Sequence, residues 1–170
     1  EKVSGTAVGC LTGYGLMRSM ITDYETTAQV KADDPVLKTE YMHYNLPRGG
    51  GDIKALLSMP SYAKEKLGGI GVVHENRGLN PYIEDVARRT ALAGFIAIAP
   101  DALTPLGGYP GDDDKGREMQ SKLDKNAMLA DFIDAFNYLN NNQSCTGKIG
   151  VVGFCFGGWI ADMLAVTIPD

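Results

Sequence analysis

The sequence has few of the residues on which metal sites, disulfide frameworks and nucleic-acid surfaces depend. Its 170 residues include three cysteines, which form no Cys-x-x-Cys pair, and only two histidines, His43 and His74. A zinc cluster or a disulfide framework therefore finds little support. The aspartates at 112–114 lack the ligand spacing of a cation loop and indicate a solvated turn, so no metal site is expected. With 16 Lys and Arg against 21 Asp and Glu, the net charge of -5 argues against nucleic acid as a partner.

Long apolar runs are also missing. The longest nearly uncharged stretch, residues 3–17, would span only about 22 Å as a helix, which is short of the ~30 Å hydrocarbon core of a bilayer. A membrane span is therefore not expected. Apolar residues make up 44% of the chain and charged residues 22%, proportions typical of a folded domain with a core rather than of a disordered chain.

The first 34 residues differ in composition from the rest. Residues 1–22 are rich in small residues and then become apolar, which resembles the apolar core of a secretory signal but equally fits an ordinary N-terminal helix. This composition favours export over a cytoplasmic location. The polar stretch that follows predicts a connector. We therefore expect two parts, a signal-like helical segment with its connector at 1–34 and a globular domain at 35–170.

Hydrophobic patterning after residue 35 alternates between strands and helices. Two strand-like segments flank a glycine-rich turn and predict an antiparallel hairpin, at 39–45 and 53–59. Three short apolar runs predict buried strands, each followed by a helix; the strands are 69–73, 95–99 and 148–153, and the helices 83–93, 115–142 and 157–168. Because parallel strands need crossover helices, this order predicts an α/β fold with a mostly parallel, twisted sheet and helices on both faces.

The clearest chemical signal lies where the last buried strand meets its helix. Residues 153–158 read Gly-Phe-Cys-Phe-Gly-Gly, the pattern of a nucleophile elbow with cysteine at the nucleophile position. The turn is so tight that its flanks favour glycine. The helix N-terminus favours a thiolate at Cys155, and the backbone N–H of Phe156 is available to an oxyanion. The alternative for Cys155 is a buried structural thiol.

A second group of polar residues follows the first buried strand, where residues 74–80 read His-Glu-Asn-Arg-Gly-Leu-Asn. Ligands of open α/β sheets bind beyond the carboxyl ends of the strands, so we expect this loop and the elbow to face each other. The Asn76 N–H is the candidate for a second oxyanion donor, and Glu75 is a carboxylate able to hold or take the thiol proton. The alternative for Glu75 is a solvated acid or the ion-pair partner of Arg77.

Together these residues resemble the dienelactone hydrolase family of α/β hydrolases. The resemblance covers residues 36–170, and its matching pieces are the loop at 72–80, the helix from Pro81 with Glu84, Asp85 and Arg88, the Gly-Phe-Ile-Ala-Ile-Ala-Pro-Asp stretch at 94–101, the loop at 107–117 and the elbow at 147–158. It implies an α/β-hydrolase fold, incomplete at its C-terminal end. It also implies a hydrolase of small-molecule carboxylic esters or lactones that works through a thiolate and an acyl-enzyme and needs no cofactor.

The resemblance also assigns roles to single residues. Cys155 matches the family nucleophile, Glu75 the glutamate that engages the resting thiol, and the N–H groups of Asn76 and Phe156 the oxyanion hole. Arg117 lies near the place where the family has a substrate-binding arginine that holds a carboxylate. The alternative for Arg117 is a charge on a helix surface.

The family's catalytic triad is not complete in this sequence. Its acid and histidine should follow the nucleophile, yet Asp162 and Asp170 are the sole acids after Cys155 and no histidine follows it. His74 is a candidate substitute, although it fits the loop pattern better. The sequence therefore predicts the N-terminal two thirds of a Cys-dependent hydrolase. The alternatives are a catalytically inactive fragment that acts by association, and a glutamine amidotransferase, a class that also uses a Gly-x-Cys-x-Gly turn.

The predicted sheet has an open edge. In the family, later strands pair beyond the strand that carries the elbow. Without them, the apolar strand at 149–152 would be exposed, and such edges promote aggregation. We therefore expect the C-terminal remainder of the domain, another chain or self-association to cover this edge.

Overall fold

The computed structural model describes residues 23–45 and 51–167. The signal-like segment at 1–22 and the glycine-rich turn at 46–50 lie outside the described residues. Within those two ranges, no helix is both long enough and apolar enough to cross a membrane.

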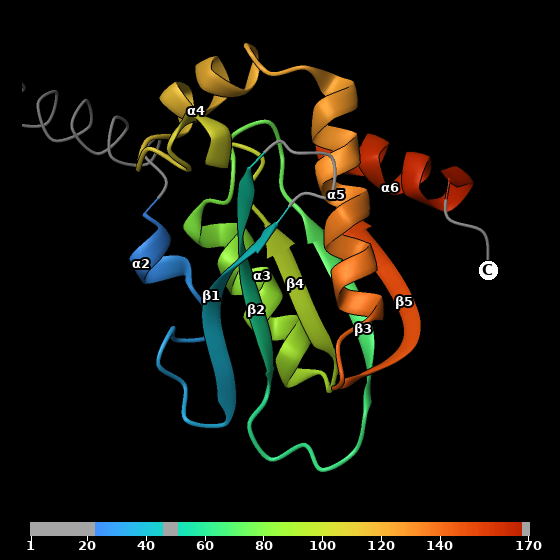
Figure 1. Ribbon diagram of the computed structural model, residues 1–170. Helices are drawn as coiled ribbons and strands as arrows, with labels where there is room; N and C mark the ends of the chain where they lie inside the picture. The colour runs from blue at the N-terminus through green and yellow to red at the C-terminus, as the bar shows by residue number, and fades with distance from the viewer. Residues whose placement is uncertain (1–22, 46–50, 168–170) are drawn as a thin grey trace, which may run out of the picture.

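Five strands form one sheet (Figure 1). They are β1 (Leu37–Asn45), β2 (Asp52–Pro60), β3 (Leu67–Val73), β4 (Ile96–Pro100) and β5 (Cys145–Gly153), in the spatial order β1-β2-β4-β3-β5. β2 pairs antiparallel with both β1 and β4, whereas β3 pairs parallel with both β4 and β5. β2 therefore runs against the other four strands, and the predicted hairpin and mostly parallel sheet are confirmed.

Helices cover both faces of this sheet, as predicted (Figure 1). They are α2 (Tyr24–Thr27), α3 (Pro81–Leu92), α4 (Asp113–Gln120), α5 (Lys125–Asn140) and α6 (Phe156–Thr167), with a short 3-10 turn η1 at Thr104–Leu106. The alternation along β4 shows the two layers. Ala97 and Ala99 pack in the cluster that contains apolar residues of α3, whereas Ile96 and Ile98 pack with α5 and α6.

The single helix predicted at 115–142 is wrong, because the structure divides it into α4 and α5. Two aspartates start separate helices here. The Asp112 side chain accepts the N–H of Lys115, and the Asp124 side chain accepts the N–H of Ala127. Each side chain satisfies a backbone donor that has no partner within its helix, so the chain begins a new helix at each cap.

The segment before β1 is held on α3. Asp85 Oδ1 accepts the Val30 N–H at 2.8 Å, and Arg88 Nε donates to the Val30 carbonyl at 2.9 Å. The Val30 side chain packs with Leu37 and Ala91. Two charged residues of the helix from Pro81 are thus buried anchors for the chain that leads into the sheet.

β5 lies at the edge of the described sheet. It pairs with β3 on one side, and no described residue pairs with it on the other. A groove of about 630 Å³ runs beside it between α5 and α6, and its apolar lining includes Phe136, Ile149, Val151 and Leu164. The described residues thus leave this edge open, as the sequence predicts.

Candidate active site

Cys155 lies on the turn between β5 and α6 and is exposed. Its φ is 53°, and no other non-glycine residue among those described has a positive φ. A non-glycine residue in this region stores about 1–3 kcal/mol of strain, which the surrounding structure must hold. Here the N–H of Gly158 donates to the Cys155 carbonyl at 2.9 Å. The backbone takes the tight turn that the Gly-x-Cys-x-Gly pattern predicts.

Two glycines allow this turn to sit against the neighbouring strand. A Cβ on Gly153 would lie 1.9 Å from the Gly157 carbonyl oxygen, and a Cβ on Gly157 would lie 2.4 Å from that of Val73. The same position on Gly157 lies 2.8 Å from the carbonyl oxygen of His74. The start of α6 therefore touches the chain immediately before Glu75, which brings the elbow beside the loop at 74–80.

Two backbone N–H groups are the oxyanion donors predicted from the sequence. Across the described residues, neither the Asn76 N–H nor the Phe156 N–H donates to a protein acceptor. Phe156 is the first residue of α6, where backbone N–H groups have no partner within the helix. Both N–H groups are therefore free of protein acceptors, and their joint role as an oxyanion hole beside Cys155 stays a prediction.

His74 is fully buried and both of its ring nitrogens are engaged by backbone. Nδ1 donates to the Glu75 carbonyl, and Nε2 accepts the Ala102 N–H at 3.1 Å. Burial lowers its pKa, outweighing that hydrogen bond and the nearby carboxylates of Asp101 and Glu75, which raise it. The imidazole is thus a neutral bridge between the loops after β3 and β4, and it offers no free nitrogen to act as a base at Cys155.

Glu75 is half-buried beside Arg77. Its Oε2 lies 3.8 Å from Arg77 Nε, so the ion pair considered from the sequence is present at long range. Arg77 has a closer partner in Asp113, whose Oδ2 accepts from Nη1 at 2.8 Å. The guanidinium therefore links Glu75 to α4.

Asp113 is the centre of a hydrogen-bond hub that the sequence analysis missed. Its carboxylate accepts from Tyr24, from Arg77 at 2.8 Å, from Tyr109 at 2.8 Å and from Asn80 at 3.4 Å. Burial raises the pKa of Asp113, but these hydrogen bonds outweigh burial and hold its pKa below the ordinary value. Burial and the contact with Asp113 in turn raise the pKa of Tyr24 to about 12. The hub joins α2, the loop at 74–80, the loop after β4 and α4.

Close packing supports the hub. A Cβ on Gly116 would lie 2.3 Å from the Arg77 carbonyl oxygen, so α4 rests directly on the loop at 74–80. The sequence offers one signal for this, a glycine three residues after Asp113 within a helix, where glycine is otherwise unfavourable.

Asp113→Ala is expected to lower the free energy of unfolding by about 2 kcal/mol, because hydrogen bonds to a charged group contribute about 1.5–3 kcal/mol and several donors lose their acceptor. The adjacent Asp114 is the matched control. It is 87% exposed and pairs with Arg117 alone, so Asp114→Ala should cost less than about 0.5 kcal/mol. Urea unfolding of both variants measures the difference, and equal losses would contradict the hub.

Arg117 lies on the surface of α4. Its side chain is half-exposed, and Nη2 lies 3.2 Å from Asp114 Oδ1. Among the described residues, no hydrogen bond or ion pair joins Arg117 to the elbow. Arg117 is thus a half-exposed charge on α4, and a substrate-binding role for it stays a prediction. The part of the chain that the structure describes also holds no group of three or more His, Cys, Asp or Glu able to bind a metal ion.

Comparison with known proteins places this arrangement in a family. The family model of the dienelactone hydrolase family matches residues 53–170. The chain belongs to the dienelactone hydrolase family. The hydrolase fragment YghX of Escherichia coli (strain K12) is 49% identical over 114 residues, which cover 67% of this chain and 97% of that protein. A Salmonella typhi protein named carboxymethylenebutenolidase is 30% identical over 130 residues.

Solved structures support the same α/β-hydrolase fold. A crystal structure described as a dienelactone hydrolase from Klebsiella pneumoniae matches with a TM-score of 0.63 and 25% identity, and the match covers 78% of this chain and 56% of that one.

The match with the Salmonella typhi protein covers 74% of this chain but only 48% of that protein. The chain thus spans about half the length of the carboxymethylenebutenolidase relative that it matches.

Proposed function

We propose that this chain carries the nucleophile of a hydrolase that cleaves small-molecule carboxylic esters or lactones through Cys155. One observation carries the proposal, the exposed thiol held at a positive φ at the start of α6. The nucleophile is the deprotonated thiol, and at this position its charge would lie beside the free N–H groups at the N-terminus of α6. The Phe156 N–H belongs to the same turn, and among the described residues neither it nor the Asn76 N–H has a protein acceptor.

In the proposed reaction, Glu75 takes the thiol proton and Cys155 Sγ forms a bond to the carbonyl carbon. The negative charge moves to the carbonyl oxygen, where the N–H groups of Asn76 and Phe156 stabilise it. The carbon–oxygen bond to the leaving alcohol then breaks, the alkoxide takes the proton that Glu75 had accepted, and a thioester to Cys155 remains. Water adds to this thioester, the carbon–sulfur bond breaks, and the carboxylic acid and the thiol are released.

Attack of water in the second half of this reaction calls for the histidine base of the family's triad, which the described residues do not supply. His74 has no free nitrogen, and no histidine follows Cys155 in the sequence. We propose that this base belongs to the part of the domain that the longer relatives have in addition. Acylation of Cys155 is accordingly the step to test on this chain.

Mixing the chain with p-nitrophenyl acetate should release about one p-nitrophenolate per chain in a burst and leave an acetyl group on Cys155. The experiment uses a Cys10→Ser background, and peptide mass spectrometry locates the acetyl group. Cys155→Ala should abolish the burst. Cys145→Ala is the matched control, because Cys145 is 2% exposed and belongs to the hydrophobic core, so its loss should leave the burst intact.

A missing burst, or a burst that survives Cys155→Ala, would contradict the proposed nucleophile. It would favour the alternative of a catalytically inactive fragment that acts by association. That alternative has structural support of its own in the open edge of β5 and the groove beside it.

We further propose that polypeptide covers the β5 edge, either the remainder of the domain or a second copy of this chain. Unpaired N–H and C=O groups along an apolar edge strand favour pairing with another strand. Sedimentation velocity of this chain should show association that grows with concentration, and Val151→Lys should weaken it by placing a charge in the groove. A stable monomer across the same concentrations would contradict this expectation.

A further inference from the structure

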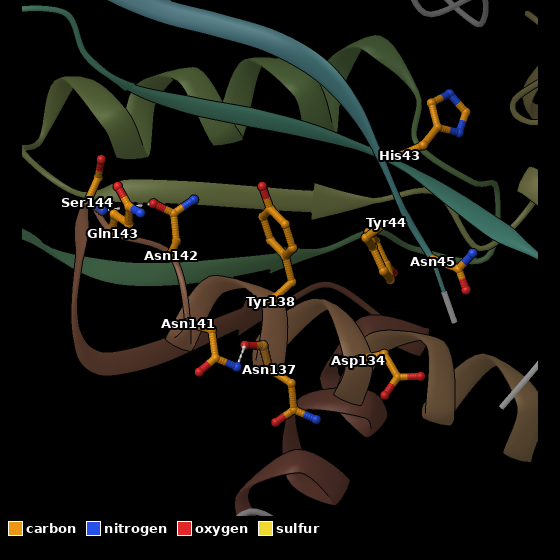
Figure 2. Close-up of a pocket in the computed structure, with 10 residues that line it drawn as sticks. All are labelled: His43, Tyr44, Asn45, Asp134, Asn137, Tyr138, Asn141, Asn142, Gln143 and Ser144. Atoms are coloured by element: carbon orange, nitrogen blue, oxygen red, sulfur yellow. Dashed lines mark hydrogen bonds between the residues drawn. The ribbon is translucent and has the colours of Figure 1, made fainter. Parts of the chain in front are cut away.

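A larger hollow lies apart from the elbow, between β1 and the second half of α5 (Figure 2). Its volume of about 790 Å³ is comparable with the roughly 300–1,000 Å³ of small-molecule sites. We call it the α5 groove. Its lining comes from the end of β1, from one side of α5 and from the turn before β5, and comprises His43, Tyr44, Asn45, Asp134, Asn137, Tyr138, Asn141, Asn142, Gln143 and Ser144.

The α5 groove is distinct from the candidate active site. None of the residues that line it belongs to the elbow or to the loop at 74–80. Ser144 precedes β5 and Cys155 follows it, so the nine residues of β5 separate them by roughly 30 Å of extended strand. A ligand in this part of the groove would therefore not contact the reacting thiol.

The polar lining of the groove is almost entirely uncharged. Five of its ten residues carry a carboxamide, Asp134 is the sole carboxylate, and neither Lys nor Arg is among them. A carboxamide both donates and accepts hydrogen bonds, as a hydroxyl group does. The groove therefore has neither a Lys nor an Arg side chain to attract an anion, and its amide groups match a ligand rich in neutral hydroxyl groups.

Several polar side chains of the groove are free to hydrogen-bond a ligand. Among the described residues, no protein group hydrogen-bonds the carboxamides of Asn137 and Gln143 or the hydroxyl of Tyr138. Neighbouring groups are fixed in place, since Asn142 accepts the Ser144 N–H at 2.9 Å and Asn141 Nδ2 donates to the Asn137 carbonyl at 2.9 Å. The free carboxamides thus stand beside a turn that its own hydrogen bonds hold.

Two tyrosines give the groove an aromatic surface. The rings of Tyr44 and Tyr138 lie 6.3 Å apart at an interplanar angle of 29°. The Tyr44 hydroxyl donates to the Asp131 carbonyl at 2.9 Å, which fixes its ring, while Tyr138 is 37% exposed. Figure 2 shows Tyr138 between Tyr44 and the polar residues at 142–144. An exposed ring beside amide groups can contact the apolar face of a sugar ring while the amides bond its hydroxyls.

We propose that the α5 groove binds a neutral, hydroxyl-rich ligand of the oligosaccharide class. The carboxamides select hydroxyl groups, the Tyr138 ring supplies the apolar contact, and Asp134 disfavours carboxylated sugars. This site is independent of the chemistry at Cys155, so the two proposals stand or fall separately.

Titration of the isotope-labelled chain with three trisaccharides, followed by NMR, tests the proposal. Cellotriose and maltotriose are the neutral probes and trigalacturonate is the anionic one. At least one neutral probe should shift the backbone signals of the groove residues. Tyr138→Ala should weaken its binding about tenfold, because one aromatic contact is lost. Gln143→Ala should weaken it about fivefold through the loss of a hydrogen bond.

Matched controls separate the groove from the rest of the surface. Tyr62→Ala removes an exposed tyrosine elsewhere on the surface. Asn140→Ala removes an amide of α5 that lines the groove beside β5 and not the α5 groove. Both variants should bind as the unchanged chain does. The proposal is overturned if neither neutral probe shifts the groove signals, if Tyr138→Ala binds with unchanged affinity, or if trigalacturonate binds as tightly as the neutral probes.

Discussion

Gly153→Ala and Gly157→Ala are expected to lower the free energy of unfolding by about 4 kcal/mol or more, among the largest effects of single substitutions. In each variant the new Cβ meets backbone rather than a movable side chain. It would lie 1.9 Å from the Gly157 carbonyl oxygen in the first variant and 2.4 Å from the Val73 carbonyl oxygen in the second. Relief requires the strand, the turn or the helix to move, so the elbow itself should be lost.

Gly158→Ala is the matched control for this prediction. It follows Gly157 in α6, and the nearest heavy atom to its Cβ outside the neighbouring turns of that helix is 3.9 Å away. Replacing a helical glycine by alanine stabilises a helix by roughly 0.5–1 kcal/mol, so this variant should be neutral or more stable. Urea unfolding followed by circular dichroism gives the three values. A tolerated Gly153→Ala would show that the turn is looser than the structure describes.

His74→Ala should cost about 3–4 kcal/mol at neutral pH, because it leaves a cavity in the core and a backbone donor and acceptor without partners. The ring is fully buried, contacts Phe132 edge-on at 5.7 Å between centroids, and bridges the backbone of Glu75 and Ala102. This loss is larger than that expected for Asp113→Ala, whose side chain is partly exposed. Urea unfolding at pH 7 measures it.

His74 should also make stability depend on pH. Burial lowers its pKa in the folded state, so below the unfolded value of about 6.5 the unfolded chain binds a proton that the folded chain does not. Stability from this group is therefore full above about pH 6.5 and falls on acidification by up to about 1.4 kcal/mol per pH unit. His74→Ala removes this slope.

Asp131 changes stability with pH in the opposite direction to His74, so the two contributions must be measured separately. Burial, and then the charge of Asp134, raises the pKa of Asp131 to about 6, so the folded state gains relative stability as pH falls through 6 towards the unfolded value of about 3.9. The difference between the unchanged chain and His74→Ala cancels this contribution. His43→Gln, which removes the other histidine, should keep the slope, and a slope that disappears with His43 instead would contradict the assignment.

Local sequence patterns were sufficient to predict the parallel strands of the sheet and their order along the chain. The apolar runs at 69–73, 95–99 and 148–153 correspond to β3, β4 and β5, and their order along the chain gives the parallel part of the sheet. The elbow conformation also followed from sequence, because the requirement for glycine is local to the turn. The division between α4 and α5 was missed, since a capping aspartate within an amphipathic segment resembles an ordinary surface residue.

The aspartates at 112–114 show why the rest could not be predicted. As a run they indicated a solvated turn, yet the structure gives them three different roles. Asp112 caps α4, Asp113 holds the hub and Asp114 pairs on the surface with Arg117. The partners that distinguish Asp113 come from positions 24, 77, 80 and 109. Such contacts exist only after the chain has folded, so residue type and spacing do not encode them separately.

The attachment of the segment before β1 determines how this domain can be tethered. Tyr24 is hydrogen-bonded to Asp113, and Val30 to Asp85 and Arg88. The polypeptide between them therefore lies along the domain surface and does not act as a flexible linker. Anything joined to the chain ahead of Asp23 would consequently start from a fixed point beside α3 and α4. The position of this point relative to the Cys155 turn is set by the fold of the domain.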